Sequence, residues 1–243
     1  MQQQPTALEG IGYKQQLLRA VYGVYSPWVE RFPLACKKGC AACCTQSVTM
    51  TSMEGEMILD FVRREGREKW LLEKLDRDRP GKSTAAMTTN HFAKACLDHQ
   101  EVCVDNWGSW DFTPCIFLVE NTCSIYEVRP FGCRSFGSFV KCEAGRAAEI
   151  APRHLAVNTV FTQIIEHVSS DGGYWATMND ILLSLADCNT QDWKIHLLPA
   201  QPVPGFLIEP HEKHTVKTLL KQLREKFSEK GVFGDLIDNC MPI

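Results

Sequence analysis

The chain has 243 residues, of which 44% are hydrophobic and 23% are charged, the balance of an ordinary globular protein. Its 26 basic and 29 acidic residues give a net charge of −3, which provides no general attraction to nucleic acid or anionic lipid. A chain of this length buries about 70–75% of its unfolded surface, so it needs no disulfide in order to fold. We therefore expect no nucleic-acid partner and no membrane partner.

The first helices are predicted from apolar residues at helical spacing, which indicate a helix that ends before Pro27. Thr51 followed by Glu54 is a capping-box pattern and predicts the start of a second helix. The helical pattern resumes after Gly66. Residues 77–90 are rich in Arg, Gly, Ser and Thr, which predicts a loop.

The second half of the chain is also mainly helical, with helices predicted over residues 152–168 and 174–187. Prolines between residues 199 and 210 indicate an extended connection. Apolar residues from Val216 to Phe227 then predict a last helix with one apolar stripe.

The middle of the chain differs, because residues 116–126 predict a short β-hairpin. We predict a mostly α fold, in which a helical domain over residues 1–198 encloses a small irregular cysteine-rich metal-binding subregion at about residues 32–142. Residues 199–243 are expected to form the proline-rich connection and a C-terminal helix packed on that domain. The sequence shows no alternation of strands and helices of the kind that would indicate a parallel sheet.

We expect neither a signal peptide nor a membrane-spanning helix in this sequence. The segment from Met1 to Thr6 lacks the basic start and apolar run of a signal peptide. No stretch approaches the ~20 apolar residues that span a bilayer. We therefore expect a cytoplasmic protein, in a reducing compartment where stable disulfides are rare.

Twelve cysteines are the unusual feature of the composition. Four lie between Cys36 and Cys44, and four more lie between Cys115 and Cys142. Buried free thiols that act as small hydrophobes would explain the isolated Cys188 and Cys240. That explanation suits four cysteines within nine residues poorly, since such clusters in reducing compartments indicate metal binding or catalysis.

The first cluster is Cys36, Cys40, Cys43 and Cys44. On a helix these four thiols would share one face, and a straight helix cannot wrap them around one tetrahedral ion. Either Gly39 breaks the helix so that the segment forms a loop, or thiols from elsewhere complete the site. The first three cysteines also have the Cys-x3-Cys-x2-Cys spacing of radical S-adenosylmethionine enzymes, which need a βα barrel that this sequence does not indicate.

The second cluster comprises Cys115, Cys123, Cys133 and Cys142. The predicted hairpin holds two thiolates close together, and Gly132 permits a turn that directs Cys133 back toward it. Arg129 and Arg134 are candidates for offsetting the negative charge of a thiolate cluster and for donating hydrogen bonds to it. The alternative is that both arginines are surface residues.

These two blocks together resemble a known family, the bacterial and archaeal cysteine-cluster proteins with a CxxCxxCC signature. That family is described as zinc- or iron-chelating or as iron–sulfur proteins, and a related domain occurs in flagellin lysine-N-methylase. The first gap here is three residues rather than two. The resemblance implies the following candidate ligands, with Cys142 as a further addition: Cys36, Cys40, Cys43, Cys44, Cys115, Cys123 and Cys133.

The function we expect is metal binding, with an iron–sulfur cluster in a redox, carrier or sensing role. The alternatives are a purely structural zinc site, since zinc uses the same thiolates, and an iron–sulfur-dependent protein-modifying enzyme similar to flagellin lysine-N-methylase that binds S-adenosylmethionine. The motifs assign no catalytic residue and identify no particular protein partner or substrate. A separate zinc site is also conceivable if His91, Cys96, His99 and Cys103 share one helical face.

Overall fold

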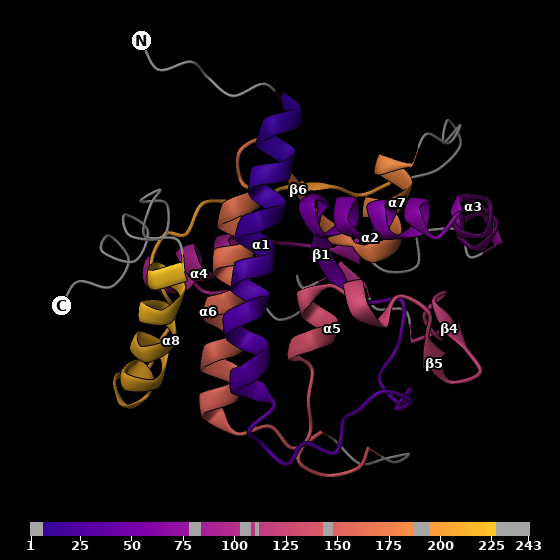
Figure 1. The fold of residues 1–243 in the computed structure, drawn as a ribbon. Helices are drawn as coiled ribbons and strands as arrows, with labels where there is room; N and C mark the ends of the chain where they lie inside the picture. The colour runs from indigo at the N-terminus through magenta and orange to yellow at the C-terminus, as the bar shows by residue number, and fades with distance from the viewer. Residues whose placement is uncertain are drawn as a thin grey trace.

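The computed structural model describes residues 7–77, 84–102, 108–109, 112–142, 148–186 and 195–226. These residues form mainly helices with a few short strands, which confirms the predicted mostly α fold class (Figure 1). In chain order the elements are α1 (Ala7–Val29), β1 (Thr49–Thr51), α2 (Ser52–Arg64), α3 (Glu68–Arg77), β2 (Thr84–Ala85), α4 (Thr89–Leu97), β3 (Gly108–Ser109), β4 (Leu118–Val119), β5 (Thr122–Cys123), the 3-10 turn η2 (Tyr126–Val128), α5 (Phe131–Ser135), α6 (Pro152–Ser169), β6 (Tyr174–Thr177), α7 (Met178–Leu185), β7 (Leu198–Pro199), the 3-10 turn η3 (Pro210–Glu212) and α8 (Lys213–Lys226).

One hydrophobic core lies among α1, α6 and α8, which stand side by side in Figure 1. Tyr25 on α1 is fully buried and its ring packs against Phe161 on α6, with the centroids 5.6 Å apart. Leu223 on α8 is also fully buried in this core. Phe131, the first residue of α5, reaches the same core and meets the Tyr25 ring edge-on. The core therefore supports the start of the helix that carries Cys133.

A second core lies beneath the cysteine-rich subregion, where α2 and α7 pack closely together. Phe117 and Ile125, which flank the β4–β5 hairpin, are buried in this core with 0% and 1% exposure. Trp70 on α3 packs against the Phe117 ring. The hairpin is thus anchored on α2, α3 and α7 rather than standing free, and Figure 1 shows it next to these helices.

The predicted capping box at the start of α2 is confirmed. Thr51 Oγ1 accepts from the backbone N–H of Glu54 at 3.3 Å, and Glu54 Oε2 accepts from the backbone N–H of Thr51 at 2.9 Å. Gly66 separates α2 from α3 with a positive φ of 63°, a conformation that glycine adopts without a steric penalty. The predicted helical continuation after Gly66 is therefore a separate helix, α3.

A three-stranded antiparallel sheet, in the order β1-β6-β7, joins distant parts of the chain. The prediction of one helix over residues 174–187 is wrong at its start, because Tyr174–Thr177 is strand β6 and pairs with β1 in the register Thr49↔Thr177. Thr177 then caps α7 by accepting from the backbone N–H of Asp180 at 3.3 Å. The end of that prediction, at residue 187, lies outside the described residues.

The segment after residue 198 returns along α6 before α8 begins. Gln163 on α6 donates to the carbonyl of Gly205 and accepts from the N–H of Leu207, at 2.8 and 3.1 Å. α8 packs on α1 and α6. The domain boundary at residue 198 stays a prediction. No helix in the described part of the chain is both long enough and apolar enough to cross a bilayer.

Candidate metal centre

The first cysteine segment is a loop made of two turns. The N–H of Cys40 donates to the carbonyl of Lys37 at 2.9 Å, and the N–H of Cys44 donates to the carbonyl of Ala41 at 3.2 Å. Gly39 has a positive φ of 92°, which an L residue rarely adopts. The segment therefore forms a loop and not a straight helix, and its role as a ligand loop stays a prediction.

The end of this loop lies against the second cysteine block. The N–H of Gln46 donates to the carbonyl of Thr113 at 3.1 Å, and Thr45 forms an antiparallel bridge with Pro114. The N–H of Cys115 then donates to the carbonyl of Cys44 at 2.9 Å. Backbone hydrogen bonds thus fix two cysteines that are 71 positions apart in the sequence next to each other.

The start of the loop is fixed elsewhere, against residues that follow α5. The N–H of Ala35 donates to the carbonyl of Ser138 at 2.8 Å, and the N–H of Ser138 donates to the thiol of Cys36 at 3.2 Å. Burial raises the pKa of Cys36, the bond from Ser138 lowers it, and the nearby Cys40, Cys142 and Cys44 raise it further. Cys36 and Cys142 are thus within electrostatic reach of each other.

The predicted hairpin is confirmed as β4 and β5, paired antiparallel with Leu118 opposite Cys123. Its turn consists of Glu120 and Asn121, both with positive φ, at 50° and 61°, the geometry of a type I′ turn. This turn lies between Val119 of β4 and Thr122 of β5. The hairpin positions Cys123 close to Cys44, whose charge raises the pKa of Cys123 after the larger effect of burial.

Cys133 brings the third segment to the site. It lies in α5, which begins after Pro130, and its N–H donates to the Pro130 carbonyl at 3.0 Å. Burial raises the pKa of the Cys133 thiol far above its usual range, and the nearby thiols of Cys115, Cys123 and Cys44 raise it further. Loop, hairpin and α5 therefore converge on one group of four thiols.

Cys43 and Cys44 form a hydrogen-bonded pair of adjacent thiols. The bond to Cys44, followed by burial, raises the pKa of Cys43, whereas the same bond lowers the pKa of Cys44. Arg129 also lowers the pKa of Cys44, against the effect of burial. Cys44 is therefore the member of this pair that loses its proton first.

The two candidate arginines lie in different environments. The Arg129 guanidinium stacks on the Tyr126 ring at 3.7 Å and lowers the pKa of Cys44, Cys123 and Cys133. Its Nε is buried and has no hydrogen-bond partner among the described residues. Arg134 instead donates through Nε to the Arg129 carbonyl at 2.8 Å and lies over the Tyr22 ring at 4.4 Å. Arg129 faces the thiols, and Arg134 holds the backbone behind them.

Tyr126 was not among the predicted site residues. The Arg129 guanidinium and the Lys38 ammonium both make cation–π contacts with its ring, and Lys38 Nζ lies 5.7 Å from the ring centroid. Two cations from the two cysteine blocks thus meet one aromatic ring, where cation–π attraction holds them. The Tyr126-Glu127 dipeptide next to the hairpin is the only local sequence signal for this role, and it does not reveal the partner cations.

The alternative zinc site on α4 does not form as predicted. α4 ends at Leu97, and His99 has a positive φ of 55° in the turn that follows. His99 therefore cannot continue the helical face that contains His91 and Cys96. Cys103, which completes that pattern, lies outside the described residues, as do Cys188 and Cys240.

One family model matches the part of the chain that contains both cysteine blocks. The family model that matches residues 35–152 is described as "Putative zinc- or iron-chelating domain", with the name CxxCxxCC. Residues 35–152 therefore match a CxxCxxCC domain. The match confirms the resemblance seen in the sequence, and it encloses the eight candidate cysteines and Arg129. No curated protein and no solved structure matches the chain.

The residues of the CxxCxxCC domain fit a metal that prefers sulfur. None of the nine cysteines in the described residues forms a disulfide, and soft thiolates select zinc, copper(I) or iron–sulfur centres. The unpaired Nε of Arg129 beside three of them is a donor for which a metal-bound thiolate is a suitable acceptor. Within the described residues, no group of three or more His, Cys, Asp or Glu side chains is already arranged to hold an ion. Metal binding would therefore draw gathered thiols into their final positions, which couples binding to local folding.

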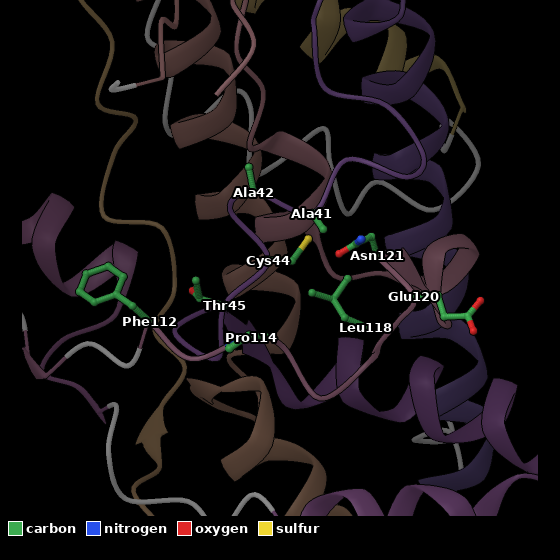
Figure 2. A pocket seen from close by; sticks show the side chains of 9 residues that line it. All are labelled: Ala41, Ala42, Cys44, Thr45, Phe112, Pro114, Leu118, Glu120 and Asn121. Carbon is green, nitrogen blue, oxygen red and sulfur yellow. The ribbon is translucent and has the colours of Figure 1, made fainter. Parts of the chain in front are cut away.

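A hollow of about 390 Å³ opens beside the CxxCxxCC loop (Figure 2). Its walls include the apolar residues Ala41, Ala42, Pro114 and Leu118, together with the Cys44 thiol. The loop and strand β4, through Leu118, therefore both line the hollow next to Cys44.

Proposed function

We propose that the CxxCxxCC domain of this chain holds an iron–sulfur cluster through its gathered cysteines, with a redox, carrier or sensing role in the cytoplasm. The observation that carries the proposal is the convergence of Cys44, Cys115, Cys123 and Cys133 from three separate segments. Cys36, Cys40, Cys43 and Cys142 extend this group on the side of the Ser138 contact.

Four cysteine thiolates suit either a zinc ion or an iron–sulfur cluster. The hydrogen bonds and charge around the thiols favour the iron–sulfur cluster. The Cys36 thiol already accepts a backbone N–H from Ser138, and Arg129 adds positive charge beside the other thiols. Hydrogen bonds and charge of this kind set the reduction potential of iron–sulfur clusters.

A carrier or redox role requires only the metal centre, whereas the enzyme alternative also requires a site for S-adenosylmethionine. The paired strands of the described residues all run antiparallel, so this part of the chain contains no βα barrel and no parallel nucleotide-binding sheet. The protein-modifying enzyme alternative requires S-adenosylmethionine bound near the centre, and calorimetry of the anaerobic protein with S-adenosylmethionine tests it. Micromolar binding with methyl transfer to protein lysines would favour the enzyme over the carrier.

The test of the metal is elemental and sulfide analysis of protein purified without oxygen. Iron together with acid-labile sulfide is the expected result. Full zinc occupancy without sulfide would contradict the iron–sulfur proposal and leave the structural zinc alternative. Reconstitution of metal-free protein with each metal, followed by the same analysis, excludes a result set by metal supply during expression.

A further inference from the structure

Glu54 is a buried carboxylate that links the capping box of α2 to the cysteine-bearing helix α5. Its side chain is 3% exposed. Oε2 accepts from the N–H and the Oγ1 hydroxyl of Thr51, at 2.9 and 3.0 Å, which is the local task of a capping-box glutamate. Oε1 is directed to residues far away in the sequence.

Oε1 of Glu54 accepts two further hydrogen bonds. The Tyr22 hydroxyl donates to it at 2.8 Å, and the backbone N–H of Phe131 donates to it at 2.7 Å across 77 residues of sequence. Phe131 is the first residue of α5. One carboxyl group therefore satisfies the initial amide of α5, whose N–H has no acceptor within its own helix.

The contacts continue from α5 to the thiols. The Tyr22 ring stacks with Phe131 at 6.3 Å between centroids, and the Arg134 guanidinium lies over Tyr22 at 4.4 Å. Arg134 in turn donates to the carbonyl of Arg129 at 2.8 Å. Cys133 lies within the same short helix. Glu54 thus holds both a candidate ligand and the arginine that faces the candidate ligands.

We propose that Glu54 is a positioning residue of the metal centre, which keeps α5, and with it Cys133 and Arg129, in the arrangement that retains metal. This inference rests on the proposed metal-binding function. Groups that orient metal ligands typically affect metal affinity 10–100-fold when they are replaced.

The chain offers a matched control in Asp180. Asp180 is the acidic residue of the corresponding cap of α7, is 1% exposed, and accepts from the Thr177 hydroxyl at 3.0 Å. Its other interactions are with His196, so it performs the capping role without a bond to α5. A second control for general loss of stability is Leu223→Ala, which removes fully buried side-chain volume from α8 in the same core that Phe131 reaches and lowers stability by about 2–5 kcal/mol.

The experiment follows metal release from anaerobically purified holoprotein to an excess of a chromophoric chelator. Glu54→Gln is expected to speed release by about 10–100-fold, whereas Asp180→Asn and Leu223→Ala release metal at the wild-type rate. Tyr22→Phe removes one of the two long-range donors and is expected to have a smaller effect of the same sign. It also keeps the proposal testable if Glu54→Gln does not fold.

Hydrogen exchange of the metal-free proteins provides a second readout. Glu54→Gln should speed amide exchange over residues 131–135, and Asp180→Asn should not. Unchanged metal release in Glu54→Gln, or equal acceleration in Leu223→Ala, would overturn the positioning role. A wild-type protein that binds no metal would instead contradict the proposed function.

Discussion

Replacing Cys133 by serine should remove metal from the whole domain, because this thiol belongs to the group in which the three segments meet. Serine keeps the shape of the side chain, and α5 retains its support from Glu54 and the Phe131 ring contacts. Cys96→Ser is the matched control. Cys96 is also a half-buried free thiol, and it lies on α4 rather than in the loop, the hairpin or α5.

The size of the effect follows from sharing the binding energy among four ligands. Structural sites with four ligands bind zinc with about 10–16 kcal/mol, which is about 2.5–4 kcal/mol per ligand. Each 1.4 kcal/mol is a factor of ten, so loss of one thiolate should weaken binding by roughly 100- to 1000-fold. Cys44→Ser should have a comparable effect, since the Cys44 backbone pairs with Cys115 and its charge acts on Cys133.

The assay is metal content per protein after equilibration with a competing chelator of known affinity, without oxygen. Cys133→Ser and Cys44→Ser should lose the same metal, and Cys96→Ser should retain it. Metal content that is unaffected by Cys133→Ser would refute the convergence of the three segments on one centre. Loss of different metals in the two variants would show two independent sites.

Three further outcomes follow from the described contacts. For an iron–sulfur centre, Arg129→Gln should lower the reduction potential measured by anaerobic titration, because removing positive charge disfavours the more negative reduced state; a higher potential would contradict this role. Burial raises the pKa of Asp180 from 3.8 to about 6, so the folded form holds the proton more tightly. The free energy of unfolding of the wild type should therefore fall by up to about 3 kcal/mol relative to that of Asp180→Asn as the pH rises from about 4 to about 6. A difference in unfolding free energy that stays constant over this pH range, measured by denaturant unfolding, would contradict it. Gly55→Ala should destabilise the fold by about 1–3 kcal/mol in urea unfolding, since the added Cβ would lie 2.5 Å from Ile181 and 2.8 Å from Leu185; an unchanged midpoint would show that α7 moves aside.

The parts of the fold that follow from the sequence are those with local causes. The capping box of Thr51 and Glu54 and the turn at Gly66 depend on neighbouring residues, and the capping box appears as predicted. β6 depends instead on pairing with β1, whose residues lie more than 120 positions earlier. Tyr174–Thr177 therefore resembles the start of the following helix in sequence, and only the partner strand makes it a strand.

The candidate site divides in the same way. Cysteine spacing and family resemblance identify the thiols as a group, and the turn at Gly39 shows locally why the first block is a loop. The sequence does not reveal that Cys44 pairs with Cys115, because that contact is made by backbone atoms of distant segments. Nor does it separate Arg129 from Arg134, whose roles are set by the rings of Tyr126 and Tyr22. The second task of Glu54 is hidden for the same reason.

X-ray absorption at the metal edge of the anaerobically purified protein tests the central claim most directly, because it reports the atoms bound to the metal. The account predicts a shell made of sulfur, together with metal–metal scattering from an iron–sulfur cluster, and loss of this signal in Cys133→Ser. A sulfur shell around isolated zinc would favour the structural zinc alternative. A shell of nitrogen and oxygen atoms would contradict a centre held by the gathered cysteines.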